Sequence, residues 1–242
     1  MSAHLVPVRV TASLAGGIAH AGTWGIALDG LLASQLREQD KAAAADTGTV
    51  VAGLHDLDDP PDLPLPLARC GTGQRWHWAA TCAWPVDGHG LMPDVRWWSG
   101  RVDHADLEVL ADGMPAIVSE RQGRYRARWM PLLTTVCSAV SWYAVGDPER
   151  IRRLLVGLPA IGKKRAAGHG QVTGWEVAPM PELDPWNAGH LHPDGSLGRP
   201  CPVECLAGRQ VRVAGAGVAG IRPPYMHPAR AHELALPTAG PA

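Results

Sequence analysis

The residues of this chain best suited to bind a charged ligand lie together in the segment 161–174, which reads IGKKRAAGHGQVTG. Glycine permits positive φ angles and close approach to a ligand, and successive N–H groups in such a loop can form an anion-binding nest. Lysine adds positive charge, and arginine adds bidentate contacts to phosphate. The segment therefore predicts a polyphosphate ligand, either a nucleotide or a nucleic acid. We expect its contacts from Lys163, Lys164, Arg165, Gly168, His169, Gly170 and Gln171, with backbone N–H groups of residues 168–171 assisting.

The distribution of charge along the chain favours a nucleic acid. The whole chain of 242 residues has a net charge of −1. Residues 121–174 contain 10 Lys and Arg against 2 Asp and Glu, whereas residues 1–120 contain 7 against 15. Local charge, rather than the total, sets the attraction to phosphates. A basic run alone is most simply a solvated face, but its junction with a glycine-rich loop favours RNA or DNA as the ligand.

A second basic stripe is predicted upstream of the glycine-rich segment. Arg124, Arg126 and Arg128 alternate with Tyr125, Ala127 and Trp129. In a β-strand this period places three guanidiniums on one face, which makes them candidates for further phosphate contacts. Candidates for stacking on a base are Trp142, Tyr143 and Trp175, although core packing is the commoner role of such residues.

Two segments match the residue pattern of nucleotide-binding motifs wholly or nearly, but they lack the structural context that these motifs need. Residues 157–164 (GLPAIGKK) carry Lys164 where a P-loop needs Ser or Thr for magnesium, and they follow a predicted helix where a P-loop precedes one. Residues 215–220 (GAGVAG) match the dinucleotide fingerprint, but Pro223 and Pro224 follow at once, so no helix can begin there to receive a pyrophosphate. We interpret the second segment as a glycine-rich turn.

Metal binding and catalysis have weaker support in the sequence. Four possible ligands occur close together, but their spacing is looser than the paired cysteines of structural zinc sites, which favours a plain loop with two buried thiols. These residues are His190, His192, Cys201 and Cys205. We predict no metal and no cofactor. His169 is a candidate general base for RNA cleavage, but no second acid–base residue lies near it in sequence, which favours a contact to phosphate or base instead.

Length and composition are those of a globular protein. The chain is long enough for one large domain or two small ones and for a sizeable core. It has no apolar run of about 18 residues, so no membrane span is expected. The N-terminus lacks the features of a signal peptide. The 5 cysteines are an odd number at irregular spacing. Reduced thiols and a cytoplasmic location are therefore expected.

The periodicity of apolar residues and the positions of turn-forming residues predict an α+β fold. A strand is expected at 6–14 and a helix at 28–45, followed by an acidic, proline-rich loop at 56–66. Short strands are expected at 96–99 and 116–119, and residues 75–84 favour β-structure.

The second half is more regular. A strand is expected at 134–145, a helix at 147–157 with Asp147 as its N-cap, and a returning strand at 171–177. With the first strand and helix, this order indicates a ferredoxin-like sheet. We expect one or two strands within 206–221 and an irregular tail from residue 223.

Several segments resemble one protein family. They read LDGLLA (28–33), WHWAAT (76–81) with AWPV (83–86), WYAVGD (142–147), the glycine-rich segment continued to 177, and RPCPV (199–203). Together they resemble the RAMP superfamily, the RRM-like RNA-binding subunits of CRISPR effector complexes. More narrowly, they resemble the Cas-five-type subunit of type IV systems. The resemblance implies an RRM-like domain over 1–203 with loop insertions around 46–120, and a C-terminal β or irregular extension over 204–242.

The resemblance also implies a function. Such a subunit clasps the 5′ handle of the CRISPR RNA and caps the backbone of the effector complex. Its implied partners are the CRISPR RNA, the backbone subunits, the large subunit and target DNA within the complex, with no membrane. The resemblance implies that the subunit is not an enzyme. The alternative is a metal-independent endoribonuclease that matures the CRISPR RNA, with His169 as the base.

Overall fold

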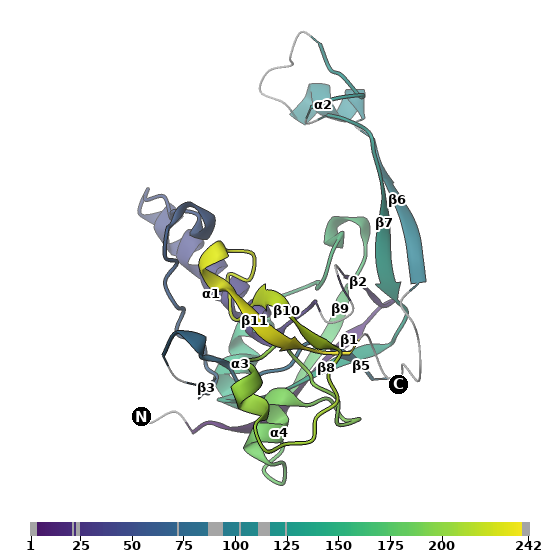
Figure 1. The fold of residues 1–242 in the computed structure, drawn as a ribbon. Helices are drawn as coiled ribbons and strands as arrows, with labels where there is room; N and C mark the ends of the chain where they lie inside the picture. Colours follow the sequence, from purple (N-terminus) through teal and green to yellow (C-terminus); the bar gives the residue numbers. More distant parts are fainter. Residues whose placement is uncertain are drawn as a thin grey trace.

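A computed structural model describes most of the chain, namely residues 4–20, 22, 25–71, 73–86, 94–101, 103–110, 117–123 and 125–238. The architecture is mixed α and β, with antiparallel sheets and few helices (Figure 1). Within these ranges, no helix is long and apolar enough to cross a bilayer.

The main sheet has four strands in the order β5–β8–β1–β9, all antiparallel to their neighbours. Their bounds are Trp84–Pro85 (β5), Ala139–Gly146 (β8), Val6–Leu14 (β1) and Val172–Pro179 (β9). The central strand β1 has the bounds that the sequence predicted. From Val8 onward every second residue of β1 is buried, which is the period of a strand with one face on the core.

Two helices supply the other half of this core. Helix α1 (Leu28–Asp46) and helix α3 (Pro148–Leu155) contact each other, and their buried leucines and isoleucine join the valines of β1 in one cluster. The sequence predicted both helices. Asp147 caps α3, because its carboxylate accepts the backbone N–H groups of Glu149 and Arg150 at 3.1 Å each. Helix α4 (Pro185–His190) packs against β8 through Ala188 and Val145.

The predicted strand at 134–145 is two strands that belong to different sheets. Strand β7 (Arg128–Thr135) pairs with β2 (Ile18–His20), whereas β8 pairs with β1. The chain changes sheets opposite Gly17, which has φ 89° and where a Cβ would collide with the carbonyl oxygen of Thr135. This close approach, which only glycine permits, is not visible in the local pattern of residues 134–145.

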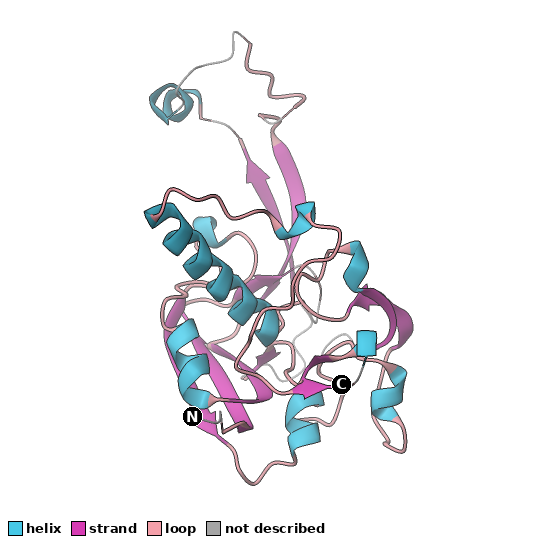
Figure 2. Ribbon diagram, turned by 90° about the vertical axis from the view of Figure 1, so that its left-hand side faces the viewer, coloured by secondary structure: helices cyan, strands magenta, loops and turns pink. Residues whose placement is uncertain are grey.

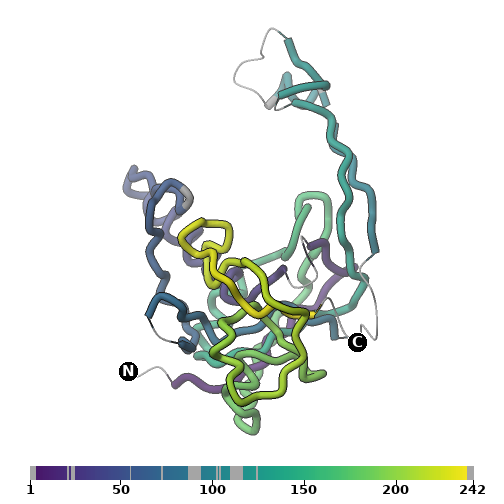
Figure 3. Tube along the Cα trace, in the orientation of Figure 1, coloured from purple at the N-terminus to yellow at the C-terminus, as the bar shows by residue number. Residues whose placement is uncertain are grey.

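Strand β6 (Asp94–Gly100) pairs with β7 to form a long ribbon, which we call the projecting hairpin. It extends away from the main sheet and carries helix α2 (His104–Leu110) near its tip (Figures 1 and 2). The teal trace of Figure 3 follows it out and back. The predicted strand at 96–99 lies within β6. Residues 117–119 of the strand expected at 116–119 are irregular, and residue 116 lies outside the described ranges.

The predicted stripe of three arginines on one strand is wrong. Strand β7 begins only at Arg128, whose partner Gly100 is the last residue of β6, so the ladder ends there. Tyr125 lies in a turn and Arg126 is irregular, while Arg124 lies outside the described residues. The alternation of arginines therefore reflects a connection rather than a strand.

The C-terminal region is more ordered than predicted. Strands β10 (Gly215–Gly220) and β11 (Ala231–Leu236) form an antiparallel hairpin. Strand β10 lies within 206–221, where one or two strands were expected, so the interpretation of 215–220 as a glycine-rich turn is wrong. Strand β11 lies in the tail that was expected to be irregular from residue 223. Glycine weakens the sequence signal of a strand. Here a Cβ at Gly220 would collide with the backbone of Tyr225. The remaining short elements are β3 (Arg69–Cys70), β4 (His77–Trp78) and the 3-10 turns η1 (Leu54–Asp56), η2 (Gly73–Arg75), η3 (Arg165–Ala167), η4 (Val203–Leu206) and η5 (Pro228–Arg230).

A buried arginine joins three of the segments that carry the family resemblance. Arg199 is 1% exposed, and its guanidinium lies 3.6 Å from the carboxylate of Asp29, which is fully buried at the start of α1. The hydroxyl of Tyr225 donates to the same carboxylate at 2.6 Å. Arg199 also donates to the carbonyl oxygens of Trp78, Ala80 and Ile221. The segments 28–33, 76–81 and 199–203 therefore meet in the interior, at what we call the arginine junction.

Candidate nucleic-acid interface

The segment 161–174, which we call the glycine loop, leaves the end of α3 and returns into β9. Three of its glycines have positive φ: Gly162 (81°), Gly168 (85°) and Gly170 (67°). Lys164 also has positive φ, at 56°, which is uncommon for a residue with a Cβ. The glycine content is thus used to turn the backbone, as the sequence predicted.

Backbone hydrogen bonds to β2 and to the residue before it hold the glycine loop in place. The N–H of Lys163 donates to the carbonyl oxygen of Ala19 at 2.6 Å, and the N–H of Gly170 donates to that of Gly17 at 3.1 Å. A Cβ at Gly170 would collide with the carbonyl oxygen of Ile161. Gly170 is therefore needed for the fold of the loop.

These backbone hydrogen bonds contradict part of the predicted anion nest, in which the N–H groups of residues 168–171 face the ligand. The N–H of Gly168 donates to Arg165 at 3.0 Å, and that of Gly170 is used as described. Neither group points to a ligand, so a phosphate at this loop would be bound mainly through side chains. His169 is half-buried, and Gln171 is exposed.

Two of the three cations face a cleft. Lys163 and Arg165 are exposed and line a cleft of about 310 Å³ between the glycine loop and the first turns of α1, which contribute Gly30 and Ser34. His20 of β2 lines the same cleft. Its Nε2 lies 3.0 Å from the hydroxyl of Thr135, and burial lowers its pKa. No sequence pattern pointed to His20, because its place depends on the pairing of β2 with β7.

The third cation connects the loop to the projecting hairpin. The Nζ atom of Lys164 lies 3.1 Å from the centroid of the Trp98 ring, a cation–π contact. Trp98 is opposite Met130 in the ladder, so Arg96 and Arg128, two positions away along their strands, share its face. Arg96 lies 3.6 Å from the carboxylate of Asp94, but both groups are exposed, so this pair is weak. One face of the hairpin thus combines cations with an aromatic ring.

The other face of the hairpin is apolar and exposed. Trp97 is 60% exposed and Trp129 is 73% exposed, and their ring centroids lie 4.8 Å apart. Val95 continues this face with 50% exposure. Large exposed aromatic residues commonly mark a binding surface, and in nucleic-acid proteins they stack on bases. Sequence reasoning missed this pair, although both tryptophans lie in segments predicted to be strands.

The aromatic residues proposed for base stacking have other roles. Trp142 is fully buried, and its indole N–H donates to the carbonyl oxygen of Ile26 at 2.9 Å, so the prediction that it stacks on a base is wrong. Trp175 is half-buried, packs on Trp142 at 5.8 Å and donates to Leu158 at 3.1 Å. Tyr143 is half-buried beside Arg9 in the main sheet.

The four possible metal ligands near the C-terminus do not form one group. His192 packs on the ring of Trp84 with centroids 4.6 Å apart, and Cys201 is buried against Leu197 and Ala235. The other two, His190 and Cys205, lie together with two residues from much earlier in the chain, Cys70 and His77. That combination was not predicted, because its halves are separated by more than a hundred residues.

Comparison with known families identifies the chain. The family model for CRISPR type IV associated protein Csf3 matches residues 6–236, from the first residue of β1 to the last residue of β11. The chain belongs to this family and is a type IV CRISPR-associated protein. No curated protein matches the chain.

Proposed function

We propose that this protein is the RNA-binding subunit of a type IV CRISPR effector complex that holds the 5′ handle of the guide RNA at the end of the backbone. The observation that carries this proposal is the contact of Lys164 with Trp98, which brings the glycine loop and the projecting hairpin together. Membership of the type IV family supplies the context. The alternation of cations and aromatic rings over these two elements is the combination that binds single-stranded nucleic acid.

The proposed fold class is ferredoxin-like, as in RAMP proteins. The elements β1, α1, β5, β8, α3 and β9 follow the β-α-β-β-α-β order, and the sheet order β5–β8–β1–β9 agrees with it. Strand β5 is short, at 2 residues, so the sheet is narrow at that edge. In this interpretation, the hairpin β6–β7 is an insertion between the second and third strands of the unit.

The proposed RNA path has two parts. Lys163 and Arg165 contact phosphates at the cleft beside α1, and Arg128 and Arg96 continue the cationic path along the hairpin. Trp97 and Trp129 stack on one or two bases on the opposite face. The proposed protein partners are the backbone subunits and the large subunit, with target DNA held in the assembled complex.

We propose that the subunit does not cut RNA. Cleavage by the 2′-hydroxyl needs a base, an acid and stabilisation of charge. The glycine loop offers His169 as a base, and its cations can stabilise charge. No second acid–base residue that could act as the acid lies near His169 in the sequence. The endoribonuclease alternative is tested by incubating the protein and its His169→Ala variant with repeat RNA in buffer without divalent cations. We expect intact RNA with both proteins; cleavage by the unmodified protein that the variant loses would establish the alternative.

The binding proposal is tested by isolating the protein from cells that also express its CRISPR array and partner subunits, and by sequencing the RNA that remains bound. We expect repeat-derived RNA with a common 5′ end, and its loss from a Lys163→Gln, Arg165→Gln double variant that still enters the complex. Equal recovery of unrelated cellular RNA would contradict a specific role at the handle.

A further inference from the structure

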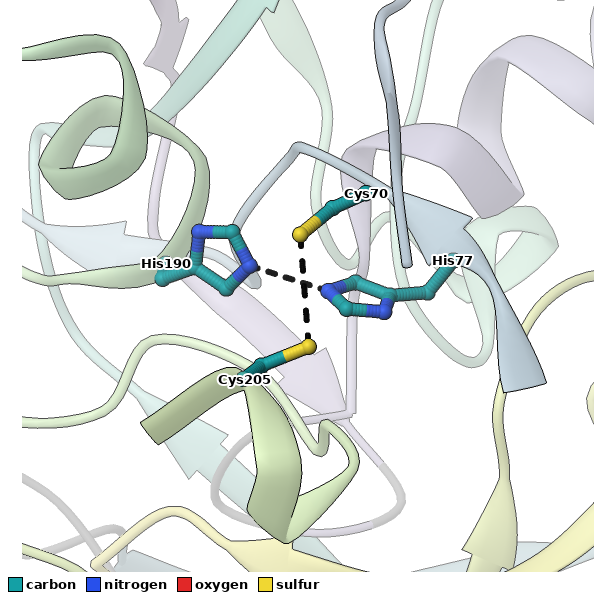
Figure 4. A group of neighbouring side chains, drawn as sticks. All are labelled: Cys70, His77, His190 and Cys205. Carbon is teal, nitrogen blue, oxygen red and sulfur yellow. Dashed lines mark hydrogen bonds between the residues drawn. The ribbon is translucent and has the colours of Figure 1, made fainter. Parts of the chain in front are cut away.

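Four side chains with metal-ligating atoms converge at one point. Two of them precede the glycine loop in the sequence, and two follow it. Cys70 ends β3, His77 begins β4, His190 ends α4 and Cys205 lies in η4. Their ligand atoms all lie within 4.8 Å of one another. Figure 4 shows that the two sulfurs and two ring nitrogens point toward a common centre.

Two of the distances between ligand atoms are close to those of tetrahedral coordination. The two Sγ atoms are 3.9 Å apart, and the two Nε2 atoms are 2.9 Å apart. With zinc bond lengths of about 2.3 Å to sulfur and about 2.0–2.1 Å to nitrogen, the corresponding edges of a tetrahedron are about 3.8 Å and about 3.3 Å. The lines that join each pair cross in Figure 4, as two opposite edges of a tetrahedron do in projection.

The donor set of the cluster suits a metal. It consists of two cysteine sulfurs and two imidazole nitrogens. Thiolate and neutral imidazole are the forms that zinc binds.

A second layer of contacts orients His190. Its Nδ1 lies 2.8 Å from the carbonyl oxygen of Trp186, so this nitrogen carries the proton and Nε2 is left as an acceptor toward the cluster. The Trp186 ring stacks on the imidazole at 4.6 Å, and Arg209 covers the other side of Trp186 at 3.9 Å. A carbonyl on the outer nitrogen is the usual partner of a metal-binding histidine.

We propose that Cys70, His77, His190 and Cys205 bind one Zn²⁺ ion in a closed, structural site. Two sulfur and two nitrogen ligands in tetrahedral arrangement are typical of zinc, and four protein ligands leave no position for a substrate. Both histidines are almost completely buried, at 0% and 1% exposure. The ion fixes β3 and β4 to α4 and η4, which are far apart in the chain, and so stabilises the same region as the arginine junction. This inference does not depend on RNA binding.

The test measures metal in the full-length protein purified without chelators. Elemental analysis should give one zinc ion per chain, and Cys70→Ser and Cys205→Ser should each abolish stoichiometric zinc. The matched control is Cys137→Ser, because Cys137 is a buried thiol between β7 and β8, outside the cluster. It should retain zinc.

A second measurement avoids variants that fail to fold. Cobalt exchanged into the unmodified protein should give the visible absorption of a tetrahedral site with thiolate ligands, and removal of zinc by a chelator should lower the melting temperature. Substoichiometric zinc in reduced protein, a Cys70–Cys205 disulfide in freshly isolated protein, or loss of zinc from Cys137→Ser equal to that from Cys70→Ser would overturn the proposal.

Discussion

The arginine junction and the glycine loop with its hairpin use the same residue types in opposite ways. At the junction, Arg199 is 1% exposed and its guanidinium is surrounded by a carboxylate and carbonyl oxygens. At the hairpin, Trp97 is 60% exposed, and at the loop Arg165 faces solvent in a cleft. Groups with all their partners inside the protein hold the fold, whereas groups that face solvent can bind a ligand. Three of the segments that carry the family resemblance meet at the junction, and the glycine-rich segment forms the loop.

The largest expected effect is at the junction. Arg199→Met should lower the free energy of unfolding by about 3–5 kcal/mol, because it leaves the Asp29 carboxylate buried without the positive charge that faces it. Urea denaturation measures the change. Lys41→Met is the control, since Lys41 pairs with Glu38 at 2.8 Å on an exposed helix face, and it should cost about 0.5 kcal/mol or less. Equal costs would mean that the junction is not a structural centre.

Two glycines of the loop should differ next. In Gly170→Ala, backbone strain at positive φ costs about 1–3 kcal/mol, and a collision with the backbone of Ile161 adds to this cost. Gly168→Ala has similar φ, but its Cβ enters open space, so it should cost only about 1–2 kcal/mol. Thermal melting compares them. A Gly168 variant as unstable as the Gly170 variant would show that φ alone decides.

The exposed tryptophan pair should matter for RNA and not for stability. Trp97→Ala and Trp129→Ala should each weaken RNA binding by about 1–3 kcal/mol if each ring stacks on a base. Fluorescence anisotropy with labelled single-stranded repeat RNA measures this. Val95→Ala removes exposed apolar surface from the same face without a ring, and it should bind normally. If all three variants bind equally well, the face serves a different partner.

The smallest effect concerns the link between loop and hairpin. A double-mutant cycle of Lys164→Met and Trp98→Leu should give a coupling energy of about 0.5–1 kcal/mol in unfolding, as for a partly exposed cation–π pair. A coupling near zero would mean that the two elements are not joined through this contact.

Local signals predicted the elements whose causes are local. The alternation in β1 and the Asp147–Pro148 start of α3 each contain their own explanation, and both elements lie where they were expected. The split of the 134–145 segment and the reach of the hairpin depend on pairing with distant residues, and neither was predicted. Strand β10 lies within 206–221, where one or two strands were expected, but its partner β11 was not predicted.

The same distinction applies to the sites. The cations of the glycine loop are adjacent in sequence, so they could be named as candidates, and their contact with RNA stays a prediction. His190 and Cys205 were named as possible metal ligands, but Cys70 and His77 were not, because they reach the cluster only through the fold. The pair Trp97 and Trp129 is visible only once the register of β6 and β7 is known.

The salt dependence of RNA affinity tests the central claim most directly. Two double variants each remove two exposed charges: Lys163→Gln with Arg165→Gln in the loop, and Arg150→Gln with Arg153→Gln on α3. Each phosphate contact contributes about 0.7 to the slope of log affinity against log salt for a single strand, so the loop variant should flatten the slope by about 1.4. The α3 variant should leave the slope nearly unchanged. Equal slopes for the loop variant and the unmodified protein would contradict RNA binding through the glycine loop.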